Sequence, residues 1–233
     1  MPEHKKLRVA VIGCGMIHVE HMQGYAELKD KVEIVAAVDR KRECLEAVRD
    51  KWGLPENALF ADWDTMLAEV RPDAVDLCLP NYEHFPAAMD AIAAGCHVYC
   101  EKPLTFSVQE GRQIIDAVNA NGVVFQTGSQ QRSEAAFRNA VQLARTGMLG
   151  DIKCVYCNVP WRFPTVYNWP AEDLPKGIDW DMWIGPAPMR AYSDHLLARL
   201  RKHPKGAYDY DWGEWRWHSD YGNGMQADWG AHH

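Results

Sequence analysis

Up to about residue 150, short apolar runs alternate with amphipathic segments. The runs are rich in Val and Ile and do not alternate strictly with polar residues, which is typical of strands buried on both faces of a parallel sheet. They cover Leu7–Ile12, Val32–Val38, Ala74–Leu79, His97–Cys100 and Val123–Thr127. The segments between them have helical periodicity, so the pattern predicts an α/β fold with right-handed crossovers.

Two of the expected helices carry signals at their ends. Ser107 followed three residues later by Glu110 is a capping box, which predicts a helix start at this point. Ser133 is expected to cap the next helix, and Gly147 is expected to stop it.

The pattern fades after residue 150. Eight of the 10 Trp and seven of the 13 Pro fall in the last 83 residues, and Asp151–Val159 is the one clear strand. The rest lacks regular periodicity over a length that is uncommon inside a compact domain. We therefore expect a first domain at residues 1–150 and an incomplete α+β domain at residues 151–233. The Trp side chains could fill a hydrophobic core, or they could stack on the C–H faces of a sugar, and none is assigned to a site.

Composition narrows the function classes. The formal net charge is −7 and the pI is about 5.8, which argues against binding to nucleic acid or to an anionic membrane. No apolar run approaches the ~18 residues of a membrane span, and the N-terminus lacks a signal-peptide core. Seven Cys residues follow no disulfide spacing, and Cys154 and Cys157 would face opposite sides of a strand. We expect a cytoplasmic protein without a metal site.

The first apolar run ends in the sequence Gly13-Cys14-Gly15-Met16-Ile17-His18. The first Gly permits a tight turn and the second lets backbone approach a pyrophosphate, which the following helix start can bind through free N–H groups. Gly13, Gly15, Met16 and Ile17 are therefore predicted to bind a dinucleotide. His18 occupies the third small position, where close packing normally requires Gly or Ala.

Asp39 ends the second apolar run, 26 residues after Gly13. An acid at this place can accept a hydrogen bond from a ribose 2′-hydroxyl and repel a 2′-phosphate, which favours NAD over NADP. Arg40 beside it could accommodate a phosphate, so NADP stays possible.

Two later loops should line the same crevice, because ligands bind beyond the carboxyl ends of parallel strands. Pro80, Asn81 and His84 follow one apolar run, and Asn81 could also be a helix cap with His84 in the first turn. Glu101 and Lys102 follow the next run. A Lys there could stabilise negative charge on a reacting oxygen.

Together these motifs resemble the Gfo/Idh/MocA oxidoreductases, typified by glucose–fructose oxidoreductase and inositol dehydrogenase. Five motifs in the right order carry the resemblance: Gly13-x-Gly15, Pro80-Asn81-x-x-His84, the segment from Ala94 to Pro103, the segment from Leu174 to Pro188, and Asp228-Trp-Gly-Ala-His232.

The resemblance implies a Rossmann domain, then a C-terminal α/β domain with an open, mostly antiparallel sheet. It also implies a nicotinamide cofactor, a sugar or polyol substrate, and a cis peptide between Lys102 and Pro103. Lys102, Asp228 and His232 match catalytic residues of the family. On a helix, Asp228 and His232 would share one face. His232 or Lys102 would take the hydroxyl proton, hydride would pass from carbon to nicotinamide, and Lys102 would stabilise the developing alkoxide.

Family chains are usually much longer, so we expect a fragment whose homo-oligomerisation requires a complete second domain. Two other functions stay open. One is an enzyme of the same family that opens a glycosidic bond by transient oxidation, and the other is a truncated, non-catalytic NAD-binding protein.

Overall fold

A computed structural model describes residues 5–156, 166–197, 199–202, 208–211, 213–222, 224 and 228–232. The chain divides into two compact units, Met1–Gly128 and Ser129–His233. The division predicted at residue 150 from the sequence stays a prediction.

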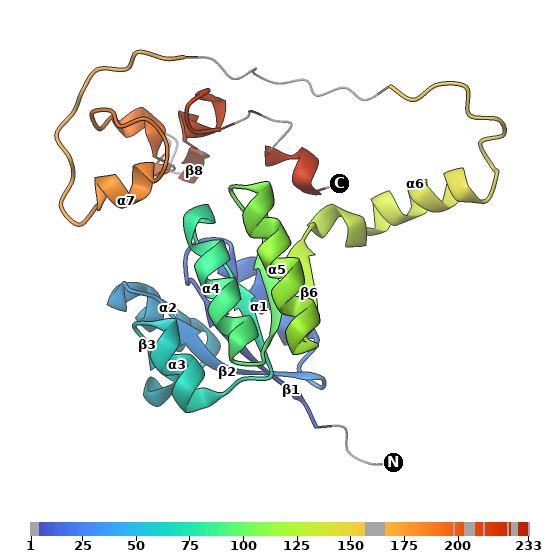
Figure 1. Ribbon diagram of the computed structural model, residues 1–233, viewed down its shortest axis with the longest axis horizontal. Coiled ribbons are helices and arrows are strands. Elements are labelled where there is room, and N and C mark those ends of the chain that lie inside the picture. The colour runs from blue at the N-terminus through green and yellow to red at the C-terminus, as the bar shows by residue number, and fades with distance from the viewer. Residues whose placement is uncertain are drawn as a thin grey trace. The chain divides into compact units, whose positions relative to one another are not determined.

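The first unit is built on a six-stranded sheet in the order β3-β2-β1-β4-β5-β6. Figure 1 labels β1, β2, β3 and β6 of this sheet. All neighbouring strands are parallel, which confirms the predicted fold class. The strands are β1 Leu7–Ile12, β2 Val32–Val38, β3 Leu59–Phe60, β4 Ala74–Leu77, β5 His97–Glu101 and β6 Phe125–Gly128. The strand order reverses between β1 and β4, and this is where open α/β sheets place their ligands.

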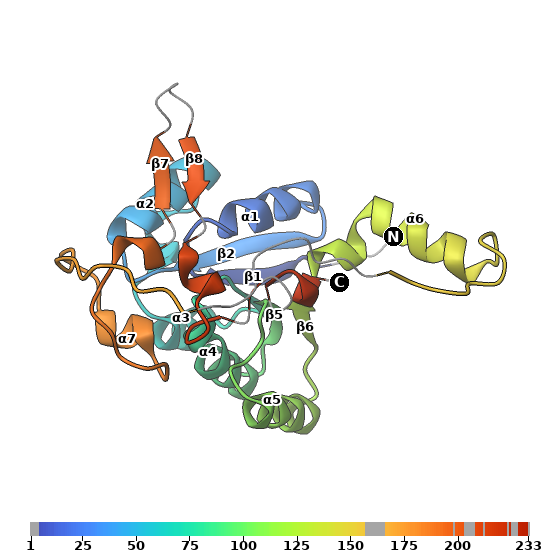
Figure 2. The same ribbon diagram turned by 90° about the horizontal axis from the view of Figure 1, so that it is seen from above.

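Five helices cover this sheet on both faces (Figure 2). Their bounds are α1 His18–Glu27, α2 Arg42–Trp52, α3 Trp63–Val70, α4 Asn81–Ala93 and α5 Val108–Asn121. Buried residues of α1 and α2 form one apolar cluster with the sheet, and those of α3, α4 and α5 form the other. Burial on both faces explains why the strands read as continuous apolar runs.

Two predicted helix caps differ from the structure, whereas the capping box of Ser107 with Glu110 is confirmed. Ser133 is not a cap, because it ends a short 3-10 helix and Glu134 adopts the extended backbone that precedes α6, Ala135–Arg145. Gly147 does follow the end of α6, with a φ of 77°. Asn81 is the first residue of α4, and Pro80 occupies the N-cap position without a side-chain hydrogen bond to the helix.

The second unit contains α6, a short helix α7 at Trp180–Ile184, and an antiparallel pair, β7 Arg199–Lys202 with β8 Tyr208–Asp211. The strand predicted at Asp151–Val159 is wrong over residues 151–156, which have no regular structure. Residues 157–159 lie outside the described part. The physical reason is that a strand needs a neighbour for its N–H and C=O groups, and none of the described strands pairs with this segment. No helix in the described ranges is long and apolar enough to cross a membrane.

Gly13 sets the geometry where β1 ends. Its φ is 94°, a value that other residues rarely adopt, and a Cβ there would lie 2.5 Å from the Cys78 carbonyl oxygen after β4. The ends of β1 and β4 can therefore approach this closely only with Gly at residue 13. Gly15 has open space around its Cα and no such backbone conformation.

We expect Gly13→Ala to lower the free energy of unfolding by about 3 kcal/mol, because backbone strain and a backbone clash add together. Urea denaturation followed by circular dichroism measures this loss. The matched variant Gly15→Ala should lose less than about 1 kcal/mol. Equal losses in the two variants would contradict the assignment of the strain to Gly13.

Candidate active site

The turn after β1 is held to the end of β2. The backbone N–H of Cys14 donates a hydrogen bond of 2.8 Å to Asp39 Oδ2. His18, the first residue of α1, is buried, and its Nδ1 contacts the Gly15 carbonyl oxygen. The imidazole therefore folds back onto the turn instead of pointing to solvent. Met16 and Ile17 stay exposed just before α1, at 52% and 36%, where a bound ligand could cover them.

Charged groups surround the end of β2. Asp39 Oδ1 accepts a second hydrogen bond of 2.8 Å, from the backbone N–H of Lys41. The neighbouring Arg40 forms an ion pair with Glu83 in the first turn of α4. Burial raises the pKa of Glu83, although the charge of Arg40 opposes that shift. The negative charge of Asp39 also raises the pKa of Glu83, so the two carboxylates interact here.

His84 joins the loop after β4 to the loop after β5. The side chain is fully buried, and its Nε2 and Nδ1 lie 2.9 Å and 2.7 Å from the carbonyl oxygens of Leu79 and Pro103. Burial lowers the pKa of this imidazole. His84 therefore contacts both loops from inside the unit, and its neutral ring, with one N–H, donates to one of the two carbonyl oxygens at a time.

Glu101 and Lys102 lie at the carboxyl end of β5. The Glu101 side chain is buried, and its Oε2 accepts a 3.1 Å hydrogen bond from the backbone N–H of Lys102. The peptide bond between Lys102 and Pro103 is cis, which confirms the expectation from the family resemblance.

A buried network next to these loops escaped sequence analysis. His21 of α1 places its Nδ1 2.8 Å from Asp76 Oδ2 of β4 and its Nε2 3.1 Å from Glu101 Oε1. The Tyr25 hydroxyl donates a 2.9 Å hydrogen bond to the same Asp76 oxygen. Asp76 is completely buried. Its position inside an apolar run was the available signal, because a charge in a buried strand requires a partner.

The network favours a charged imidazole. A neutral imidazole has only one N–H, whereas both ring nitrogens of His21 face carboxylates. Burial opposes the charge, but the hydrogen bonds to Asp76 and Glu101 outweigh it and raise the pKa of His21 to about 9. Burial would raise the pKa of Glu101, but the bond to His21 brings it below its usual value.

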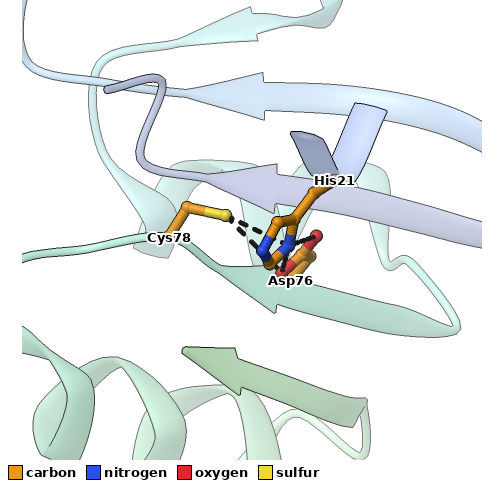
Figure 3. A group of neighbouring side chains, drawn as sticks. All are labelled: His21, Asp76 and Cys78. Atoms are coloured by element: carbon orange, nitrogen blue, oxygen red, sulfur yellow. Dashed lines mark hydrogen bonds and ion pairs between the residues drawn. The ribbon is translucent and has the colours of Figure 1, made fainter. Parts of the chain in front are cut away.

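His21, Asp76 and Cys78 bring ligand atoms within 4.8 Å of one another (Figure 3). A metal would need a neutral imidazole and a thiolate. Burial instead raises the pKa of Cys78 well above its usual range, and the Cys78 Sγ lies within hydrogen-bonding distance of both partners. We therefore interpret the three side chains as part of an ion-pair network.

The remaining predicted site residues, Asp228 and His232, belong to the second unit. Asp228 forms an ion pair of 3.3 Å with Arg216. His232 is buried at the end of a 3-10 helix, Gly230–His232, and its ring centroid lies 5.8 Å from that of Trp229. A 3-10 turn after Asp228 replaces the single α-helical face expected for the pair. Their convergence with Lys102 stays a prediction.

The first unit thus gathers the turn after β1, the acid after β2 and the Lys after β5 on the carboxyl edge of one sheet. Free backbone N–H groups at the start of α1 suit a pyrophosphate, and Asp39 suits a ribose hydroxyl. Residues 7–129 match the family model described as "Oxidoreductase family, NAD-binding Rossmann fold". Residues 135–232 match the one described as "Oxidoreductase family, C-terminal alpha/beta domain".

The chain belongs to the Gfo/Idh/MocA oxidoreductase family. Its Rossmann unit is an NAD-binding domain, which confirms the fold class and the predicted cofactor. A D-glucoside 3-dehydrogenase of Escherichia coli is 31% identical over 146 residues, which cover 63% of this chain and 41% of that protein. An inositol 2-dehydrogenase of Salmonella typhimurium is 26% identical over 62% of this chain and 43% of its own length.

Solved structures of dehydrogenases from this oxidoreductase family are also similar to this chain. The scyllo-inositol dehydrogenase of Lactobacillus casei, crystallised with NAD(H) and scyllo-inositol, has a TM-score of 0.59 and 26% identity over 63% of this chain and 43% of that chain. The WlbA dehydrogenase of Bordetella pertussis, in complex with NADH and UDP-GlcNAcA, has a TM-score of 0.58 and 29% identity over 63% and 44%. The chain matches less than half the length of each of these four relatives.

The raised pKa of His21 predicts a pH-dependent stability. A folded pKa of about 9 against 6.5 in the unfolded chain means that the stabilisation is fully present below pH 6.5 and is lost as the pH rises toward 9. We expect the free energy of unfolding to fall by roughly 2 kcal/mol between pH 6.5 and 8.5. Urea denaturation across this range measures it, and His21→Gln is the control that should lack the fall. Parallel curves for both proteins would contradict the prediction.

Proposed function

We propose that this chain comes from an NAD-dependent dehydrogenase that oxidises a hydroxyl-bearing carbon of a sugar or polyol. The observation that carries the proposal is the placement of Lys102 on the same sheet edge as the Gly13 turn and Asp39. The substrate class is supported by relatives named as glucoside and inositol dehydrogenases.

The chain's residues fit the cofactor. Gly13 keeps the turn close to the end of β4, and Asp39 has both carboxylate oxygens oriented by backbone N–H groups of Cys14 and Lys41. A carboxylate oxygen can accept more than one hydrogen bond, so Asp39 can still accept a ribose hydroxyl. NAD bound at these residues would supply the acceptor for a hydride from the carbinol carbon.

The charges at the end of β2 favour NAD over NADP. A 2′-phosphate would meet the carboxylate of Asp39, and the nearby Arg40 is already paired with Glu83. Placing a phosphate there would set two negative groups together without an uncommitted cation at Arg40.

In the proposed reaction, the ammonium of Lys102 stabilises negative charge on the substrate oxygen as the C–H bond breaks. His232 or Lys102 receives the hydroxyl proton. Asp228 favours the protonated form of His232 after transfer. The last two roles rest on the family resemblance and require the second unit to approach Lys102.

Asp39→Asn tests the cofactor assignment. The substitution keeps one carbonyl oxygen for the Cys14 N–H but removes the negative charge. We expect the ratio of the NADP Kd to the NAD Kd to fall about tenfold, because a hydrogen bond to a charged group and a repulsion are both lost. Titration calorimetry measures both constants. Asp50→Asn on the exposed face of α2 is the matched control, and an unchanged ratio in Asp39→Asn would remove Asp39 from cofactor selection.

Lys102→Ala tests the catalytic assignment. We expect kcat on inositols or alkyl glucosides to fall by a factor on the order of 10² or more, with the NAD Kd changed less than about threefold. NADH absorbance follows turnover, and calorimetry follows binding. Lys51→Ala on α2 serves as the control that should retain full activity. Normal turnover in Lys102→Ala would exclude Lys102 from the chemistry.

A further inference from the structure

A continuous set of hydrogen bonds links the core of the first unit to the backbone of Lys102. It begins at Asp76 on β4, passes through the imidazole of His21, and reaches the Glu101 carboxylate at the end of β5. The other oxygen of that carboxylate accepts the Lys102 N–H at 3.1 Å. Asp76, His21 and Glu101 lie on three different elements, β4, α1 and β5, and Lys102 directly follows Glu101, so the orientation of each group depends on the next.

Both ends of the set are fixed by their surroundings. Asp76 is completely buried and is also bonded to the Tyr25 hydroxyl, so the carboxylate cannot turn away from His21 without leaving a buried charge unpaired. At the other end, the Glu101 side chain occupies space that is open because Gly128 of β6 has no side chain. A Cβ at Gly128 would lie 2.7 Å from Glu101 Oε1.

We propose that His21 is a positioning residue, which orients Lys102 by clamping the Glu101 carboxylate between β4 and β5. The proposal rests on the proposed function, because it gives the clamp a role in the reaction of Lys102. His21 does not act on the substrate in this account. Its contribution is to keep the Lys102 backbone, and therefore the direction in which the side chain leaves the strand, in one arrangement.

The clamp requires a positively charged side chain that donates one hydrogen bond to Asp76 and another to Glu101, from two separate nitrogens. Charge-assisted hydrogen bonds are shorter and stronger than neutral ones, and a displacement of about 1 Å at a reacting group can cost about 10²-fold in rate. A Gln at residue 21 carries both of its N–H donors on one nitrogen and has no positive charge, so it cannot present a charged donor to each of the two carboxylates. Glu101 would then face the charge of Asp76 without the intervening cation, and its hold on the Lys102 N–H would weaken.

The decisive variant is His21→Gln, assayed in the full chain with NAD and inositols or alkyl glucosides. We expect kcat to fall about 10- to 100-fold while the NAD Kd and the substrate KM change less than about threefold. His97→Gln is the matched control, because His97 lies at the opposite end of the same strand, where its Nδ1 accepts the Val124 N–H. That variant should keep full activity. A kcat for His21→Gln equal to that of the parent would overturn the proposal.

A second measurement reads the orientation of Lys102 without turnover. Pyridoxal 5′-phosphate forms an imine with an accessible lysine amine, and borohydride reduces that imine to a stable adduct that peptide mass spectrometry locates. We expect His21→Gln to change the rate of labelling at Lys102 by at least about fivefold and to leave labelling at Lys51 unchanged. Equal Lys102 rates in parent and variant would contradict the clamp.

Gly128→Ala covers the case in which His21→Gln does not fold. It leaves the side chains of His21 and Asp76 unsubstituted. The new Cβ would meet the Glu101 Oε1 that faces His21, and would also lie 3.3 Å from the Glu101 Cα, so displacing Glu101 should give the same change in Lys102 labelling. If the parent binds NAD but oxidises no sugar or polyol, the proposed function fails, whereas the labelling rates still decide whether His21 positions Lys102.

Discussion

The cofactor edge of this protein depends on how closely the ends of β1 and β4 approach each other. Gly13 has no side chain to separate them, and its backbone lies against the carbonyl of Cys78. The turn that follows is then fixed to the end of β2 through the bond from Cys14 to Asp39. The ends of β1, β2 and β4 are thus held together, and the N–H groups at the start of α1 lie at the point where the strand order reverses.

Buried charge supplies the second constraint. Isolated ionised groups are very costly in a protein interior, so a completely buried carboxylate must be paired. Asp76 is paired with an imidazolium, His21, which reaches the end of the next strand and holds Glu101. The network therefore does more than compensate for one buried charge. It connects the helix after the phosphate turn with the strand end that carries Lys102.

Most of the Rossmann unit was predictable from the sequence, because strands buried on two faces are continuous apolar runs. The spacing of Gly13 and Gly15 likewise predicted the turn after β1. β3 was missed, since two residues carry no periodicity. The strand expected at Asp151–Val159 fails over residues 151–156, because pairing is a non-local property. The network of His21, Asp76 and Glu101 joins residues 55 and 80 positions apart. The charge of Asp76 inside an apolar run indicates that a partner is required, but it does not identify His21 or Glu101. Asp228 and His232 came from resemblance alone, and their chemistry stays a prediction.

A crystal structure of the protein with NAD tests the central claim most directly. The account predicts pyrophosphate density against the backbone of residues 13–17, a ribose hydroxyl at Asp39, and the nicotinamide ring beside Lys102. Crystals should be soaked at a concentration that calorimetry shows to be saturating. Density for the dinucleotide elsewhere on the chain, or no heat of binding and no density at this edge, would contradict it.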